Sequence, residues 1–428
     1  MKKFPVSVNQ IVEDHLCVGC GACAGLYPEQ ISMVDTKNHG KRPVVNQAAS
    51  ENHDSGIEIS DFCPGIRIQH PEIRDCPDAN PNLFTEWGPV LEVWEGHASD
   101  SDVRYRGSSG GLTNALALFC IEQTPMRGAL HVKPRKDSPI LNESAISTNR
   151  LELLEGSGSR YAPASPCDKL HEVEHGAHPV VVIGKPCDIA AANAAASQRK
   201  TLGEQIGLTI SIFCAGTPSL AATHDLMKHL DCNNPAEASM VRYRGHGWPG
   251  QMTVERVTSS GQKRRATTSY AAGWGDILQK KRQWRCHLCA DHTGELADLS
   301  VGDPWYRPVE EGDPGKSLLV VRTPRGRKIV RDAIRQGYII VEKRPADILV
   351  KSQPNLLKTR GANWGRLVTL STLGVPTPSY PGLRTYGTWK NHLDLKAKAQ
   401  SIYGTLLRVF RKKLYSAESW ERYQPQGR

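Results

Sequence analysis

Residues 180–196, VVVIGKPCDIAAANAAA, pass from four consecutive apolar residues through a glycine to an alanine-rich stretch. The run Val180–Ile183 is typical of a strand buried on both faces, and Asp188–Ala196 is typical of a helix. A second unit of the same kind follows, with a strand expected over Leu208–Phe213 and a helix from Thr217 to about Leu230. Strands that alternate with helices predict an α/β core with a partly parallel sheet.

The regions on either side of these two units differ in character. The first 90 residues are rich in Asn, His and Pro, hold five cysteines and show no regular periodicity. Helical spacing runs from Leu112 to Ile121, strand-like alternation covers residues 239–271, and Leu393–Glu421 is a helical pattern rich in Lys, Arg and Leu. We therefore expect three parts: a cysteine-rich segment (1–90), an α/β core (91–350) and a basic helical extension (351–428).

Composition narrows the class of protein. The 428 residues are 39% hydrophobic and 23% charged, and the longest apolar runs fall far short of the ~20 residues that span a bilayer. Polar residues follow Met1–Pro5 at once, without the apolar core of a signal peptide, so we expect a cytoplasmic protein with no membrane span. Twelve cysteines in a reducing compartment favour metal binding or redox chemistry over disulfides.

The positive charge is concentrated at the end of the chain. From Lys351 onward there are 14 basic and 3 acidic side chains, whereas the first 350 residues have 40 basic and 41 acidic ones. Such a tail is commonly a solvated surface. Docking to an acidic protein is the functional alternative, and binding to nucleic acid is less favoured.

The pattern Cys17-x-x-Cys20-x-x-Cys23 predicts a first iron–sulfur site. Two-residue spacers let one loop supply three thiolates to a cubane cluster, as in bacterial ferredoxins, where a proline follows the fourth cysteine. Two Cys–Pro pairs are candidates for the fourth ligand; we favour Cys63 and keep Cys76 in reserve. A zinc knuckle is the alternative, although no second Cys/His pair lies nearby in the sequence.

Four further cysteines are expected to form a second site. Cys187 and Cys214 each follow a predicted parallel strand, so both lie at the carboxyl rim of the sheet, where α/β folds place ligands. The clip Cys286-x-x-Cys289 would complete the set. A zinc site and a redox dithiol are the alternatives, as is simple burial of Cys187 and Cys214 as small apolar side chains. Burial of that kind is what we expect for Cys120, Cys167 and Cys232.

Two Gly/Ser-rich loops suggest a phosphate-bearing cofactor. The loop from Arg106 to Gly111 precedes a predicted helix and offers hydroxyls, free N–H groups and an arginine, which is the chemistry that a pyrophosphate needs. A second loop runs from Gly156 to Tyr161, and Lys185 stands at a strand end beside Cys187. Such loops are also ordinary turns, and no Rossmann fingerprint is present.

In this order, the motifs resemble the family of coenzyme F420 hydrogenase/dehydrogenase beta subunits, which includes 7-hydroxymethyl chlorophyll a reductase. The resemblance covers roughly residues 10–370. It is carried by the two cysteine sets with Cys63–Pro64–Gly65, by the loop at Arg106, by Gly184–Lys185–Pro186, and by two later segments, Gly245–Gly250 and Gly302–Trp305.

The resemblance implies a ferredoxin-like N-terminal segment, a mixed-sheet flavin-binding core, FAD and one or two 4Fe–4S clusters. By motif it assigns to the flavin pocket Arg106, Ser108, Ser109, Gly110, Gly111, Arg160 and Lys185. It assigns Cys187, Cys214, Cys286 and Cys289 to the second cluster.

Our leading hypothesis is an FAD-dependent iron–sulfur oxidoreductase that reduces an unsaturated small molecule or a deazaflavin with electrons from a ferredoxin-like donor. The alternative is a non-catalytic electron-transfer subunit of a larger redox complex, and a zinc-stabilised nucleic-acid-binding protein is a third hypothesis. His246, in a Gly-rich turn, is the candidate proton donor.

Overall fold

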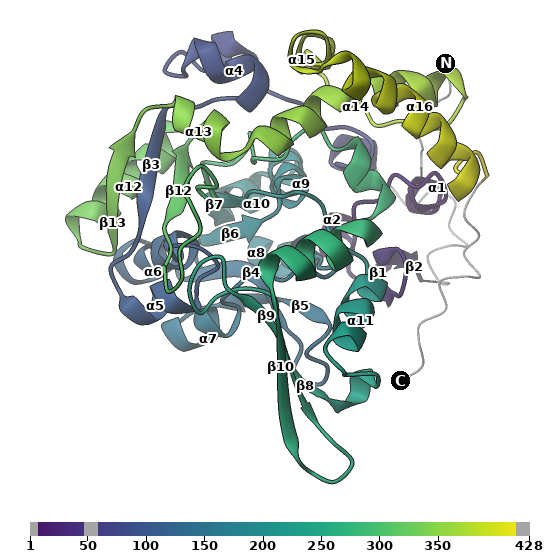
Figure 1. The fold of residues 1–428 in the computed structure, drawn as a ribbon. Coiled ribbons are helices and arrows are strands. Elements are labelled where there is room, and N and C mark those ends of the chain that lie inside the picture. Colours follow the sequence, from purple (N-terminus) through teal and green to yellow (C-terminus); the bar gives the residue numbers. More distant parts are fainter. Residues whose placement is uncertain (1–6, 47–58, 417–428) are drawn as a thin grey trace.

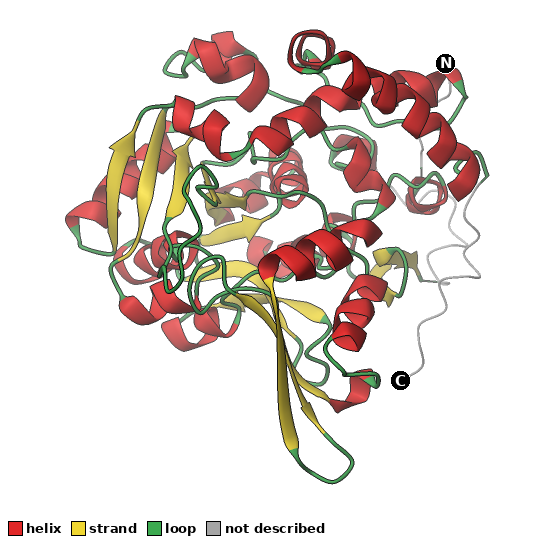
Figure 2. Cartoon of the chain, in the orientation of Figure 1, coloured by secondary structure: helices red, strands yellow, loops and turns green. Residues whose placement is uncertain are grey.

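The computed structural model describes residues 7–46 and 59–416 and has a mixed α/β architecture (Figures 1 and 2). Its strands are β1 (Ile31–Thr36), β2 (Gly40–Val45), β3 (Glu92–Ala98), β4 (Gly128–Pro134), β5 (Asn142–Ser147), β6 (Val180–Gly184), β7 (Ile206–Ile212), β8 (Ala238–Arg242), β9 (Gln251–Val257), β10 (Lys263–Ser269), β11 (Leu299–Gly302), β12 (Ser317–Val321) and β13 (Ile339–Arg344).

The helices are α1 (Val8–Glu13), α2 (Ala22–Leu26), α4 (Pro81–Trp87), α5 (Ser101–Arg106), α6 (Leu112–Gln123), α7 (Arg150–Glu155), α8 (Leu170–Glu174), α9 (Pro186–Gln198), α10 (Lys200–Gln205), α11 (Leu220–His229), α12 (Pro324–Arg335), α13 (Asp347–Ser352), α14 (Pro354–Thr372), α15 (Thr385–His392) and α16 (Leu395–Lys412). A π-helix covers Ala271–Ile277, and a 3₁₀-helix covers Trp284–Leu288. Among these helices, none is both long enough and apolar enough to cross a bilayer.

One eight-stranded mixed sheet organises the chain. Its order is β13-β3-β12-β11-β7-β6-β4-β5, in which β4, β6, β7 and β11 run parallel and the remaining strands join antiparallel. The parallel centre confirms the α/β fold expected from the strand–helix repeats. Smaller sheets are formed by β1-β2 and by β10-β9-β8.

Helices cover both faces of the sheet centre, and β6 shows how the sequence achieves this. Val180 and Val182 face the buried cluster that contains residues of α2 and α9, whereas Val181 and Ile183 face the one that contains residues of α6 and α12. A strand with two buried faces needs apolar residues at every position, which explains the unbroken apolar run. The first face also contains Val8, Ile11 and Leu26, so the N-terminal segment shares a core with the sheet.

Three sequence-based expectations need correction. The first 90 residues are not irregular throughout, because α1, α2, α4 and the β1-β2 hairpin lie there; Pro43 pairs with Met33 in a two-stranded sheet, where an edge position tolerates proline. The helix expected from Thr217 begins at Leu220 instead, since Pro218 forms an isolated bridge with Arg282. The expected tail helix ends at Lys412, and residues 417–421 of that prediction lie outside the described residues.

Candidate metal centres

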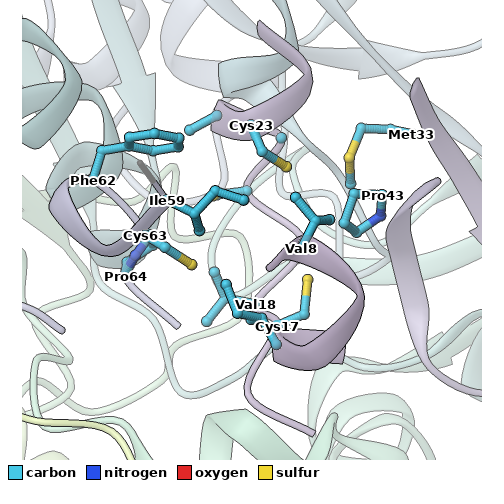
Figure 3. Close-up of a pocket in the computed structure, with 15 residues that line it drawn as sticks. Val8, Cys17, Val18, Cys23, Met33, Pro43, Ile59, Phe62, Cys63 and Pro64 are labelled. Atoms are coloured by element: carbon cyan, nitrogen blue, oxygen red, sulfur yellow. The ribbon is translucent and has the colours of Figure 1, made fainter. Parts of the chain in front are cut away.

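The structure brings together the first four cysteines chosen from the sequence. Cys17, Cys20 and Cys23 follow α1 and enter α2, and Cys63 comes from the turn after a short 3₁₀-helix. All four line one cavity, whose other walls include Val8, Ile11, Met33 and Phe62. Figure 3 shows the sulfur atoms of Cys17, Cys23 and Cys63 directed toward a common space.

Two glycines allow the loop to take this shape. Gly19 and Gly21 have φ angles of 72° and 87°, in the left-handed region. A Cβ atom on Gly19 would lie 2.7 Å from the carbonyl oxygen of Lys41, and one on Gly21 would lie 2.8 Å from the backbone nitrogen of Asp168. A side chain at Gly19 or Gly21 would therefore disturb the loop that brings the three cysteines to one cavity.

In this first quartet Cys17 and Cys20 are buried, Cys23 and Cys63 are half-buried, and the thiols interact electrostatically. Burial and then the neighbouring cysteines raise the pKa of the Cys20 thiol and of the Cys23 thiol, and they raise the pKa of Cys63 to about 12. Metal binding would replace these protons, because the thiolate is the ligand form. Burial and then Asp75 raise the pKa of Cys76, without a contribution from another cysteine. Cys63 is thus the cysteine that the structure groups with Cys17, Cys20 and Cys23.

A second quartet forms at the carboxyl ends of β6 and β7. Cys187 lies in the first turn of α9 and Cys214 follows β7, while Cys286 and Cys289 come from the 3₁₀-helix Trp284–Leu288 and the residue after it. Burial raises the pKa of the Cys187 and Cys289 thiols and raises that of Cys214 to about 12, with smaller contributions from other members of the quartet.

Backbone N–H groups are directed at the sulfur atoms of the second quartet. The N–H of Gly216 donates to Cys214 Sγ at 3.4 Å, and that of Thr217 donates to Cys286 Sγ at 3.3 Å. Donors aimed at sulfur stabilise thiolates and tune the potentials of iron–sulfur clusters. Both quartets therefore fit 4Fe–4S clusters by their donor sets.

Two cations, the half-buried Lys185 and the buried Arg285, lie beside the quartets. Lys185 donates from Nζ to Asp188 Oδ2 at 2.6 Å, and its charge acts on Cys187 and Cys214. Arg285 is 3% exposed and lies within electrostatic reach of Cys63, Cys187 and Cys289. Positive charge of this kind offsets the negative charge that four thiolates bring to each site.

Cys167 lies between the two quartets. It is fully buried, its N–H donates to the carbonyl oxygen of Cys20 at 3.0 Å, and its Sγ donates to the carbonyl oxygen of Asp188 at 3.3 Å. Cys120 and Cys232 are also buried. These three cysteines occupy interior positions, as expected for small apolar side chains.

The two Gly/Ser-rich loops meet, since Ser108 Oγ and Ser159 Oγ lie 2.8 Å apart. Other polar groups proposed for a flavin pocket are engaged within the protein. Ser109 Oγ and the Gly110 N–H both contact Ser317 Oγ, and Gly111 adopts a left-handed φ of 74° at the start of α6.

The arginines and the lysine proposed for the flavin pocket also have protein partners. Arg106 pairs with Asp102 at 2.8 Å, and Arg160 donates to Asn142, to the carbonyl oxygen of Val241 and to that of Pro139. Lys185 lies with the second quartet instead. These side chains do not form a free cradle for a pyrophosphate, and FAD binding there stays a prediction.

His246 occupies an exposed turn with a φ of 62°, stacked on Tyr105 at 4.6 Å between ring centroids and in contact with Arg242. Burial and then Arg242, Arg265 and Arg106 lower the pKa of its imidazole. A lowered pKa favours the neutral ring at pH 7, which can accept a proton more readily than donate one. The catalytic role of His246 stays a prediction.

A buried arginine forms an ion pair that joins the two later family motifs and that was not predicted from the sequence. Arg244 donates to both carboxylate oxygens of Asp303 at 2.8 and 2.7 Å, and Trp248 Nε1 donates to the same carboxylate at 2.8 Å. The Arg244 guanidinium lies 4.8 Å from the ring centroid of Tyr270 and 5.7 Å from that of Trp305. The feature of the sequence that could have indicated this ion pair is the segment Gly302–Asp303–Pro304–Trp305. That segment equally fits an ordinary strand and turn.

Comparison with known proteins agrees with the order of these motifs. The N-terminal profile of the coenzyme F420 hydrogenase/dehydrogenase beta subunit matches residues 93–172, and the C-terminal profile of the same subunit matches residues 178–347. The chain belongs to this family, so the resemblance inferred from the motifs is confirmed.

Individual relatives are distant in sequence. The coenzyme F420 hydrogenase subunit beta of Methanosarcina barkeri is 24% identical over 58% of this chain and 81% of its own length. The F(420)H(2) dehydrogenase of Methanosarcina mazei has a subunit that is 22% identical over 79% of this chain and 88% of its own length. The coenzyme F420-dependent sulfite reductase of Methanocaldococcus jannaschii is 24% identical over 75% of this chain, which spans 46% of that protein.

A solved structure shares the fold. It is a chain of the F420-reducing [NiFe] hydrogenase complex of Methanosarcina barkeri, which is 21% identical, has a TM-score of 0.53 and aligns over 72% of this chain and 99% of its own length.

Proposed function

We propose that this chain is an iron–sulfur electron-transfer subunit of an oxidoreductase complex whose two-electron substrate is a deazaflavin of the coenzyme F420 type. One observation carries the proposal: eight cysteines, of which two are buried and six half-buried, form two quartets. The relatives named above as subunits of F420-linked hydrogenases and dehydrogenases support this subunit role over a self-sufficient flavin reductase.

Each residue group has a separate task in this proposal. The first quartet would hold one 4Fe–4S cluster in its apolar cavity, and the second would hold another at the rim of the sheet. When bound, such clusters transfer electrons one at a time. Lys185 and Arg285 would favour the more negative reduced state, and the apolar walls formed by Val8, Ile11 and Phe62 would exclude water from the first site.

Three more detailed expectations, on cofactor, partner and location, are part of the same proposal. FAD bound by this chain, a ferredoxin-like partner and a cytoplasmic location are expected from the resemblance and the sequence. A subunit of this kind would need a catalytic partner for full turnover, whereas a complete reductase would not.

The test begins with protein purified without oxygen and assayed for iron, sulfide and flavin. We expect about eight iron atoms per chain, as two 4Fe–4S clusters require. Under dithionite, Cys20→Ser and Cys289→Ser should each remove a different cluster signal in the electron paramagnetic resonance (EPR) spectrum, with Cys120→Ala as the matched control. An iron-free protein with stoichiometric zinc would overturn the proposal.

The subunit role is tested with reduced F420 as electron donor. The isolated chain should consume it slowly, and the chain with its co-purified partner should consume it at a catalytic rate. Fast turnover of an artificial acceptor by the chain alone would instead support a self-sufficient reductase.

A further inference from the structure

Helix α8 carries three side chains that can bind a metal at its surface. One ligand atom from each of His171, Glu174 and His175 lies within 4.8 Å of the other two. Their spacing of three and four residues makes them neighbours on one side of the helical turn. The adjoining side of the turn carries Leu170 and Val173, which are 0% and 1% exposed and pack in the core shared with the sheet. The three side chains therefore stand on a base that the core holds in place.

A backbone carbonyl group sets the protonation of one histidine ring. Nδ1 of His175 lies 2.9 Å from the carbonyl oxygen of His171. A carbonyl oxygen can only accept a hydrogen bond, so Nδ1 bears the hydrogen, and Nε2 of the neutral ring keeps its lone pair. Histidines that bind metals are commonly held in this way, with one ring nitrogen donating to a carbonyl group and the other facing the metal. The ring of His175 is therefore prepared to act as a ligand through Nε2.

An arginine orients the carboxylate of Glu174. Arg199 Nη1 donates to Glu174 Oε2 at 2.8 Å, and the Glu174 side chain is only 11% exposed. Arg199 is itself held by the end of α2, because its Nη2 donates to the carbonyl oxygen of Leu26 at 3.0 Å and its guanidinium lies 5.3 Å from the ring centroid of Tyr27. The ion pair uses Oε2, so Oε1 is the oxygen that would bind a metal. Hydrogen bonds that hold a ligating carboxylate in this way raise the affinity of a metal site.

We infer that His171, Glu174 and His175 bind a divalent transition-metal ion of the zinc or nickel class. Two imidazole nitrogens and one carboxylate oxygen suit such an ion, whereas Mg²⁺ and Ca²⁺ prefer oxygen ligands alone. Both histidines are exposed, so their rings can turn to close the ligand set around an ion, and a tetrahedral ion keeps one position for water. The site contains no cysteine of either quartet, so the inference goes beyond the proposed function.

The sequence of α8 matches a zinc motif, but its surroundings fit binding rather than catalysis. His171-Glu172-x-x-His175 has the spacing of the helical motif of metalloproteases, in which the glutamate is the general base. Here Glu172 forms an ion pair with Lys169, and α8 is a single short helix of five residues. We therefore assign metal binding to this segment and no hydrolytic activity.

The bound ion would tie two helices together. Helix α8 supplies ligands, and Arg199 connects Glu174 with the end of α2, the helix that carries Cys23. An ion that binds the folded chain and not the unfolded one raises the free energy of unfolding. We therefore expect the metal to stabilise the fold beside the first quartet without taking part in electron transfer.

The test is isothermal titration calorimetry with NiCl₂, and then with ZnCl₂, on tag-free, cluster-loaded protein kept without oxygen. The double variant His171→Ala/His175→Ala should raise the dissociation constant about tenfold or more, since even the loss of a residue that only supports a metal ligand has an effect of that size. Glu174→Gln keeps the shape of the side chain but removes its charge, so it should also weaken binding. The matched control is His229→Ala, which removes an exposed histidine at the end of α11 and should leave the affinity unchanged.

Further measurements separate the outcomes. Ni²⁺ should raise the unfolding temperature of the wild type but not that of the double variant, and the cluster EPR signals of the two proteins should be identical. Equal Ni²⁺ affinity in both proteins would overturn the site, and so would a wild type that binds no Ni²⁺, which would leave only a contact between two imidazole rings. Full affinity in Glu174→Gln would overturn the carboxylate as a ligand. A protein without clusters whose Ni²⁺ binding still depends on the two histidines would overturn the proposed function and support this site.

Discussion

Arg285 joins the two cysteine quartets through Pro64. Its Nη2 donates to the carbonyl oxygen of Pro64 at 3.0 Å, and its Nε donates to that of Gly65 at 3.2 Å. Pro64 directly follows Cys63 of the first quartet, and Arg285 directly precedes Cys286 of the second. A single buried guanidinium therefore links the segments that carry the two sites and places one positive charge beside both.

This charge should control the cluster potentials. We expect Arg285→Met to lower the reduction potential of at least one cluster by about 60 mV, because losing about 1.4 kcal/mol of electrostatic stabilisation changes a one-electron equilibrium tenfold. Arg285→Lys should retain most of the potential while losing the fixed fork of hydrogen bonds. Redox titration followed by EPR measures both. Unchanged potentials in Arg285→Met would show that the guanidinium serves only the packing of the Cys63 turn.

The choice of the fourth ligand at the first site gives a second prediction. Cys63→Ser should lose about half of the iron, the share of one cluster out of two. Cys76→Ser should lose none, because Cys76 is not grouped with Cys17, Cys20 and Cys23. Iron analysis of the two variants, purified side by side without oxygen, provides the measurement. The reverse pattern of iron loss would contradict the structure.

The ion pair between Arg244 and Asp303 gives a third prediction, on stability. Arg244 is 2% exposed and Asp303 accepts three hydrogen bonds, so Asp303→Asn leaves a buried cation without its partner. We expect the free energy of unfolding to fall by about 3–5 kcal/mol. Asp102→Asn, which breaks an exposed pair with Arg106, is the matched control and should cost less than about 1 kcal/mol. Urea unfolding of both variants measures the difference, and equal losses would contradict the role assigned to the buried pair.

The core of the fold could be predicted because the local apolar pattern of its strands directly reflects their burial in the sheet. The run Val180–Ile183 is buried on both faces, and only a central strand of a covered sheet requires that. The N-terminal hairpin was missed because β2 contains Pro43 and its partner strand carries mixed burial, so neither strand shows clean alternation. Its stability comes from packing against the core, which a local pattern does not record.

The cysteines of the two candidate metal sites could be predicted from the sequence, but the residues that contact them could not. Spacing identified Cys17, Cys20 and Cys23, and strand ends identified Cys187 and Cys214, because these depend on short-range geometry. The role of Arg285 depends on a contact between residues far apart in the sequence, because 221 positions separate it from Pro64. Lys185 illustrates the same limit: its neighbour Cys187 is in the sequence, but its ion pair with Asp188 on the first turn of α9 appears only in the fold.

His131 gives a prediction on the pH dependence of stability. Its ring is 5% exposed, its Nε2 lies 2.7 Å from Ser147 Oγ, and burial lowers the pKa of the imidazole to about 4 from an ordinary 6.5. The charged groups that face it, Lys133 and Glu155, have smaller and opposite effects. Between pH 6.5 and about 4 the unfolded chain therefore binds more protons than the folded one, so stability falls as the pH falls. From pH 6.5 to 5.5 the loss should be about 1 kcal/mol, since one pKa unit corresponds to about 1.4 kcal/mol.

His131→Gln keeps a side-chain donor and acceptor near Ser147 but removes the titration. The free energy of unfolding of this variant should therefore decline less steeply, by about the same 1 kcal/mol. Buried His70, His287 and His292 also have lowered pKa values, but they are common to both proteins and cancel in the comparison. Urea unfolding at pH 7.5, 6.5 and 5.5 measures the two slopes, and identical slopes would mean that His131 accepts its proton in the folded protein as readily as in the unfolded chain.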